Sequence, residues 1–135
     1  MLKTSDLMTW FQGQGVDIAF SMDQLPSDDI AGGPPKRVCA ISISGGLGLE
    51  YQDALVKPTF QLLTRGVNGR DAETLAFALD TAWIDAEPSF YIGDSRVLGK
   101  GRLGGPPSFV AATTSDDLYP GLVIRAATYW CRIER

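Results

Sequence analysis

The sequence contains no histidine, which removes the usual base of a catalytic serine and a common zinc ligand. It has only two cysteines, Cys39 and Cys131, which lie far apart in strand-like runs. We expect two buried, reduced thiols, or one disulfide if the two strands are neighbours. Two cysteines without histidine do not make a zinc site, so we predict no metal-binding residues.

Long apolar runs and basic tracts are also missing. No apolar run approaches the roughly 18 residues of a membrane span. The first residues, MLKTSDLMTWFQ, lack the continuous apolar segment of a signal peptide, so we expect the protein to stay in the cytoplasm where it is made. The net charge is −4 and the basic residues are scattered, which argues against a surface that grips nucleic acid.

The chain nevertheless has enough apolar sequence to fold. Of its 135 residues, 44% are hydrophobic and 21% are charged, so a buried core is expected and global disorder is not. No internal repeat, linker or low-complexity tract divides the sequence. We therefore predict a single domain over residues 1–135.

Two stretches have the periodicity of an amphipathic helix. The first is expected from Ser5 to about Gln12, with Thr4 or Ser5 as its N-cap. The second is expected to follow Asn68, which can cap it together with Asp71 three residues later. At about 100° per residue, one stripe of this second helix spans about 120° and should face the core: Ala72, Leu75, Ala76, Leu79, Ala82, Trp83 and Ala86.

The remaining apolar stretches predict strands. Alternation predicts strands in VDIAF, RVCAISIS and TFQLLTRGV. Further strands are expected in SFYI, RVL and the closing GLVIRAATYWCRIER, which is apolar on both faces over part of its length, as a central strand is. Residues 21–36 and 46–57 are expected to be long loops. The order of elements predicts an α+β fold, a mainly antiparallel β-sheet with two helices packed on it.

The stretch SFYIGDSRVLGKG contains two features that resemble active-site motifs. Gly93-Asp94-Ser95 follows a short strand, as some nucleophilic serines do, but the chain supplies no histidine base. A serine–lysine pair would need Lys57 or Lys100 beside Ser95, and nothing in the sequence places either there. We therefore expect a turn between two strands.

Glycine spacing also fails to give a nucleotide-binding loop. Five residues separate Gly93 from Gly99, and Gly101 follows Lys100 where a phosphate loop needs serine or threonine. SISGGLGLE lacks the full spacing of a dinucleotide-binding loop. The sequence thus predicts no catalytic residue, no cofactor-binding residue and no cofactor.

One further pattern covers most of the chain. PPKRVCAISISGG is followed by a variable loop and then by KPTFQLLTRGVNGRDAETLAFALDTAW. This resembles the tail-terminator and minor capsid proteins of long-tailed, siphovirus-type bacteriophages. In that family a strand ends in Gly-Gly, a strand introduced by proline ends in Arg-Gly, and an amphipathic helix ends near a large apolar residue. The matching residues here are Gly45-Gly46, Pro58, Arg65-Gly66 and Trp83, and LVIRAATYWCRIER is similar to the closing strand.

The resemblance implies a structural protein of the virion. A tail terminator forms a homo-oligomeric, hexameric ring on the finished tail tube, stops tube polymerisation and joins the tail to the head-closure or connector protein. It is assembled in the host cytoplasm, ends in the neck of the particle and lets DNA pass without binding it specifically. A mildly acidic protein suits such a conduit because it repels DNA. Asp28, Asp29, Asp116 and Asp117 are the candidates to face the bore.

The same resemblance makes several residues candidates for contacts between subunits or with the tube. Leu47, Leu49 and Tyr51 are apolar residues in a polar loop, and they either anchor an interface or fold back on the core. Arg65 ends a strand where it either pairs across subunits or lies on the surface. Phe77 and Ile84 are further candidates, because they share a side of the second helix outside its main stripe.

Other functions remain open from the sequence. The nearest alternative is another neck component, such as a head-closure or tail-completion protein. A small hydrolase that uses Gly93-Asp94-Ser95 belongs to a different class, as does a generic binding module.

Overall fold

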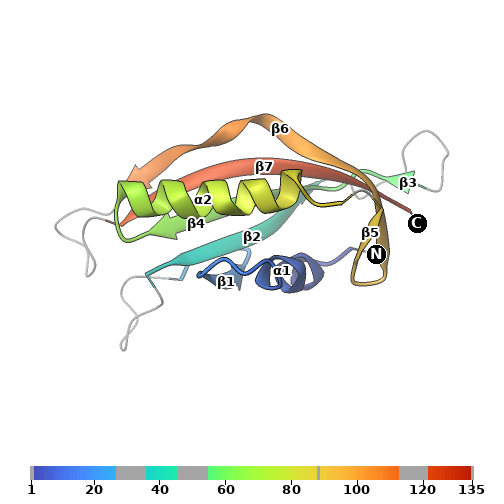
Figure 1. The fold of residues 1–135 in the computed structure, drawn as a ribbon, viewed down its shortest axis with the longest axis horizontal. Coiled ribbons are helices and arrows are strands. Elements are labelled where there is room, and N and C mark those ends of the chain that lie inside the picture. Colours follow the sequence, from blue (N-terminus) through green and yellow to red (C-terminus); the bar gives the residue numbers. More distant parts are fainter. Residues whose placement is uncertain (1, 27–35, 46–54, 88, 113–121, 135) are drawn as a thin grey trace.

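The computed structural model describes residues 2–26, 36–45, 55–87, 89–112 and 122–134. These form a curved sheet with two helices (Figure 1). The helices are α1 (Thr4–Gln12) and α2 (Gly69–Ile84). The strands are β1 (Ala19–Met22), β2 (Val38–Gly45), β3 (Leu55–Val56), β4 (Thr59–Gly66), β5 (Phe90–Ile92), β6 (Ser95–Ala112) and β7 (Val123–Glu134).

The strands make one seven-stranded sheet in the order β1-β2-β4-β7-β6-β5, with β3 paired to β7. β1 and β2 are parallel, and all the other pairs are antiparallel. The α+β prediction is therefore confirmed. β7 lies between β4 and β6, as expected of a central strand, and its residues alternate between buried and half-buried from Ala127 to Ile133.

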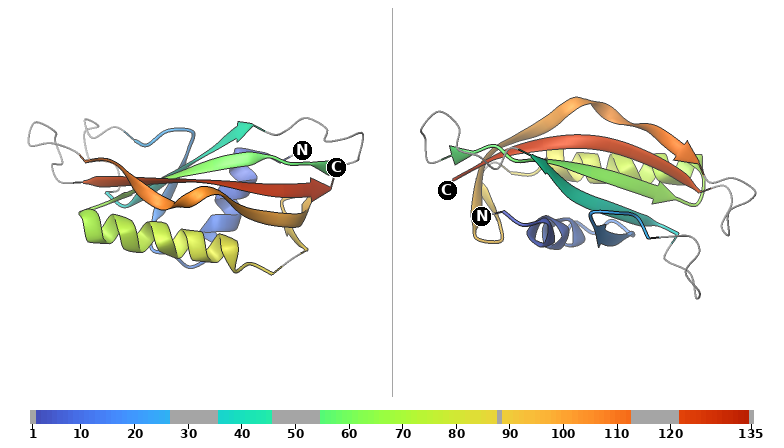
Figure 2. Two further views of the ribbon diagram at one scale, coloured as in Figure 1. Left: turned by 90° about the horizontal axis from the view of Figure 1, so that it is seen from above. Right: turned by 180° about the vertical axis from the view of Figure 1, so that it is seen from behind.

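Both helices pack on the same face of the sheet, and Trp83 of α2 joins them to it. Its ring centroid lies 5.5 Å from that of Trp10 in α1 and 4.9 Å from that of Phe60 in β4. Trp83 has no exposed surface, and its indole Nε1 donates to the Gly101 carbonyl at 3.2 Å. Figure 2 shows α2 running along the sheet. A large aromatic side chain with its N–H satisfied thus forms the centre of the core.

The predicted stripe of α2 is confirmed in its main part. Asn68 accepts a hydrogen bond from the Asp71 amide at 2.9 Å and so caps the helix as expected. The Asp71 carboxylate in turn accepts from the Val67 amide at 2.9 Å and binds Arg37. Five stripe residues are buried and two, Ala82 and Ala86, are half-buried: the buried ones are Ala72, Leu75, Ala76, Leu79 and Trp83.

Two predictions near the N-terminus were wrong in detail. α1 begins at Thr4 and its N-cap is Lys3, so neither Thr4 nor Ser5 is the cap. The reason is that Asp6 reaches back and accepts a hydrogen bond from the Lys3 amide at 3.1 Å. The first strand begins at Ala19, three residues later than VDIAF suggests, because a tight turn joins the Ile18 amide to the Val16 carbonyl at 2.9 Å.

β6 is much longer than the RVL segment that predicted it. It continues through the glycine-rich segment to Ala112 and pairs with β7 along most of this length. At Gly101 glycine has a physical reason, since a Cβ there would lie 2.7 Å from Nε1 of Trp130. The indole therefore lies against the β6 backbone, where a side chain would prevent the pairing.

The two cysteines are buried and free, as one of the two sequence expectations states. They lie in β2 and β7, which are separated by β4, so the strands are not neighbours. Burial raises the pKa of both the Cys39 and the Cys131 thiol to about 12.

Gly66 provides a test of how closely α2 packs on the end of β4. A Cβ at this position would lie 2.4 Å from the backbone nitrogen of Ala72, and backbone cannot move aside cheaply. We expect Gly66→Ala to lower the free energy of unfolding in urea by about 1–3 kcal/mol. Gly69→Ala is the matched control because nothing lies within 4 Å of its Cβ position. Equal stability of the two variants would contradict this account of the packing.

Candidate functional site

Most of the predicted contact and bore residues lie outside the described residues. The predicted interface residues in this group are Leu47, Leu49 and Tyr51. The predicted bore residues in it are Asp28, Asp29, Asp116 and Asp117. Both hypotheses therefore stay predictions. The structure describes the remaining three candidates: Arg65, Phe77 and Ile84.

Arg65 is buried at the end of β4, with 3% of its surface exposed. Its Nη1 donates to the Pro26 carbonyl at 2.9 Å and its Nε to the Lys36 carbonyl at 3.3 Å. The guanidinium thus holds two backbone segments of its own chain against the sheet. An ion pair across subunits stays a prediction, and any such pair would have to compete with these bonds.

Phe77 and Ile84 lie on the side of α2 that faces β6. Ile84 is half-buried and packs against the core, whereas Phe77 is exposed. Asp80, which is buried, shares this side because it is three residues after Phe77 and four before Ile84. Ile84 therefore makes a contact within the chain, and a role of exposed Phe77 at an interface stays a prediction.

Three consecutive residues of β6 bind α2, and we call this the α2–β6 contact. Each uses a different kind of polar group: an ammonium, a backbone carbonyl and a guanidinium. The bonds are Lys100 Nζ to the Ile84 carbonyl at 2.6 Å, Trp83 Nε1 to the Gly101 carbonyl at 3.2 Å, and Arg102 to the two carboxylate oxygens of Asp80 at 2.8 and 2.9 Å.

Asp80 is the centre of this contact, and its role was missed from the sequence. Its Oδ1 also accepts a hydrogen bond from the hydroxyl of Tyr129 at 2.9 Å. Burial, together with the bond to Asp80, raises the pKa of Tyr129, and the same carboxylate raises the pKa of Arg102. The available signal was position, because Asp80 borders the apolar stripe of α2 on the side of Phe77 and Ile84.

The Gly93 to Ser95 segment forms the expected turn between β5 and β6. Gly93 has a φ of 59°, and Ser95 is 6% exposed at the start of β6. Neither lysine that a serine–lysine pair would need binds Ser95. Lys100 Nζ donates to a backbone carbonyl of α2, and Lys57 Nζ lies 4.8 Å from the centroid of the Trp130 ring. The geometry thus gives no support to a nucleophilic serine.

Exposed apolar side chains gather on β6, on both sides of the α2–β6 contact. Four large apolar side chains of this strand are more than 40% exposed: Leu98, Leu103, Phe109 and Val110. Between Leu103 and Ser108 the strand bulges away from β7. The bulge leaves an open hollow of about 580 Å³, lined partly by Leu103, Pro106, Phe109 and Arg125.

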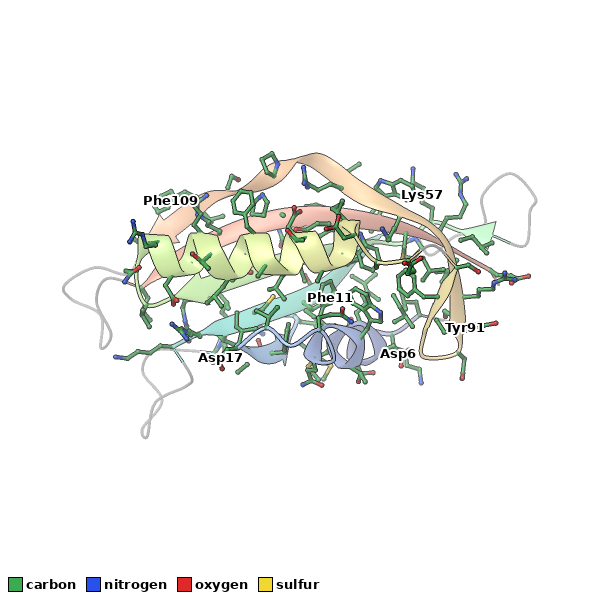
Figure 3. The ribbon with its side chains drawn as sticks, viewed as in Figure 1. Asp6, Phe11, Asp17, Lys57, Tyr91 and Phe109 are labelled. Atoms are coloured by element: carbon green, nitrogen blue, oxygen red, sulfur yellow. The ribbon has the colours of Figure 1, made fainter. Side chains whose placement is uncertain are left out.

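β6 also forms an edge of the sheet over most of its length. β5 covers only its first three residues, Ser95–Val97, and no other described strand pairs with the side of β6 that faces away from β7. β1 forms the opposite edge. Figure 3 shows Phe109, on β6, and Asp17, just before β1, on opposite sides of the molecule. The sheet therefore presents two different edges in different directions.

Two other kinds of site are absent from the described part of the chain. It contains no group of three or more cysteine, aspartate or glutamate side chains arranged to hold a metal ion. No helix in it has the length and apolar character needed to cross a bilayer. Exposed apolar residues on an open sheet edge are therefore the main candidate for a functional surface.

Tyr129 and the two thiols give a test of the buried network through pH. All three have a pKa raised by burial, so each favours the folded state at neutral pH and loses this contribution as pH rises above its unfolded pKa, near 9 for the thiols and 10 for the tyrosine. We expect Tyr129→Phe to reduce the fall in unfolding free energy above pH 10 by up to about 1.4 kcal/mol per pH unit. The fall in unfolding free energy between pH 9 and 10, which comes from the two thiols, should remain. Urea unfolding across this range measures both, and identical slopes above pH 10 would contradict the assignment.

Comparison with known proteins gives no assignment of function. No family model matches the chain, and no curated protein matches it. One matching solved structure, described only by a sequence identifier, shares 16% identity over 94% of this chain and 88% of that chain, with a TM-score of 0.47. Neither a shared fold nor a shared function follows from a match of this size.

Proposed function

We propose that the protein is a tail terminator of a long-tailed bacteriophage. In this role it forms a homo-oligomeric ring on the tail tube, ends tube polymerisation and joins the tail to the head-closure or connector protein. DNA passes through the ring without specific binding. The proposal rests first on the sequence pattern that includes Gly45-Gly46, Pro58, Arg65-Gly66 and Trp83 and ends in the closing strand β7.

The structural observation that supports a ring is the presence of two dissimilar edges on one sheet. A closed ring is built from heterologous contacts, in which one patch of a subunit meets a different patch of the next. β1 and the outer side of β6 are such a pair, because they are different in sequence, β1 ends the strand order, and β6 is open on the other side beyond its three-residue pairing with β5. Exposed Phe109 and Val110 on β6 add apolar surface that a neighbour would cover.

The pattern residues have structural roles that suit a scaffold. Gly45 ends β2 with a φ of 157°, and buried Pro58 immediately precedes β4. Gly66 lets α2 approach the end of β4, and Trp83 of α2 packs against Trp10 of α1 in the core. Each of these roles stabilises the fold, as expected of a protein whose function depends on surfaces and not on a reacting group.

Removal of the gene from the phage or prophage that encodes it tests this function. We expect tails of uncontrolled length that are not attached to heads, seen by negative-stain electron microscopy. A plasmid copy of the wild-type gene should restore tails of normal length and infectious particles. Uncontrolled tail length and the lack of attachment to heads both follow from the loss of a cap on a growing tube.

Three other outcomes would contradict the proposal. Normal tails beside heads that have lost their DNA would indicate a head-closure protein, which is the nearest alternative. Unchanged particles would remove the protein from the neck altogether. A Ser95→Ala copy that fails to restore the particles although it is folded would point to the turn serine as a functional group.

A further inference from the structure

The last five residues of β6, 108–112, form a short open edge without charge. Their sequence is SFVAA, and Phe109 and Val110 are 60% and 53% exposed. The register with β7 shifts between Phe109 and Ala111, so Val110 is the residue left without a β7 partner. An exposed apolar edge of this kind readily pairs with a strand of another chain.

The first half of β6 is protected against such pairing, which makes the second half distinctive. Lys100 lies in the first half, and α2 already bonds to three of its consecutive residues. The bulge that follows contains Pro106 and Pro107, which have no amide hydrogen to donate. Lysine, proline and bulges are the features that natural sheets use to prevent edge pairing. Residues 108–112 lie beyond Lys100 and the proline bulge, and only the one-residue register shift at Val110 interrupts them.

The other edge of the sheet offers a strand of matching size. β1 has four residues, Ala19–Met22, and pairs only with β2 on its inner side. Met22 is 49% exposed at its end. Asp17 and Asp23 flank the strand, and the side chain of Asp17 is 96% exposed. The edge is thus short, partly apolar and bordered by carboxylates.

Charge decides which pairing of edges is favoured. β6 carries three basic residues and no acidic one, whereas residues 17–24 carry two acidic residues and no basic one. All three bases precede residues 108–112, so in a two-fold β6–β6 pair they would lie at opposite ends and meet no opposite charge. In either orientation, β6 against β1 places Asp17 or Asp23 at the end of the contact that faces these bases. Because the bases of β6 already have partners in the chain, we expect the attraction between these bases and the carboxylates beside β1 to orient the contact more than to strengthen it.

We propose that residues 108–112 of one copy pair with β1 of a second copy in solution, so that the sheet continues from subunit to subunit. The occupant of the open edge is therefore this same chain, through a different surface. This deepens the proposed function and rests on it for the ring, because repeated β6-to-β1 contacts are heterologous and close only at a fixed number of subunits.

Mixed cysteine variants test the pairing directly. Val110→Cys and Met22→Cys each add one accessible thiol, since both natural cysteines are buried. With a short bifunctional maleimide, the mixture of the two variants should give cross-linked dimers, and each variant alone should give none. Tyr91→Cys mixed with Met22→Cys is the matched control, because Tyr91 is 63% exposed on the β5–β6 hairpin, at the opposite end of β6. This control should not cross-link.

Several results would overturn the proposal. Cross-linking of Val110→Cys alone would show a two-fold β6–β6 contact, and absence of cross-linking in the mixture would show that these edges do not meet. A wild-type chain that sediments as a monomer at all concentrations would have the same meaning.

A charged variant gives a second measurement. Val110→Lys, folded by circular dichroism, should weaken self-association about tenfold or more in sedimentation equilibrium. Unchanged association of this variant would overturn the edge contact.

These tests are separate from that of the proposed function. Edge pairing in a protein whose deletion leaves the tails normal would refute the terminator and leave the contact standing. Abnormal tails after deletion, with no cross-link between the edges, would refute only the contact.

Discussion

The α2–β6 contact is the interaction on which the rest of the structure depends. Asp80 is buried, and its two carboxylate oxygens bind Arg102 and Tyr129, so its charge is compensated where water cannot reach it. Removal of one partner of such a pair leaves an uncompensated charge in the protein interior. The contact thus fixes both the helix and the first half of an edge strand, which would otherwise have only β7 and the short strand β5 to hold it.

This arrangement has a consequence for the second half of β6. The strand is held by α2 up to Arg102, leaves β7 at the bulge and returns to it at Ser108. Residues 108–112 are therefore an ordered edge, because the α2–β6 contact lies before them and the β7 pairing holds one side. Pairing with an edge that is already ordered costs less conformational entropy than pairing with a loop that must first become ordered. A rigid edge suits a protein proposed to form a ring of fixed size.

Much of the fold could be predicted from the sequence, because the signals were local. Asn68 with Asp71 and the stripe to Trp83 identify α2, and alternation identifies β2 and β4. β6 was underestimated because glycine and proline normally end a strand, and the reason for Gly101 is the tertiary position of Trp130. Asp80 was missed for a similar reason. An acidic residue beside an apolar stripe has a buried role only if Arg102 and Tyr129, distant in sequence, come to meet it.

An open edge must be compatible with a chain that does not aggregate, and the structure limits the edge in two ways. Only five residues of β6 lie beyond the proline bulge, and the opposite strand β1 has four, so few backbone bonds form in each contact. A net charge of −4 on each copy adds repulsion between copies. Growth into a fibre through the proposed contact would therefore be weak per contact, whereas a closed ring would gain one additional contact and leave neither β1 nor residues 108–112 unpaired. Closure is thus the arrangement that uses this edge most completely.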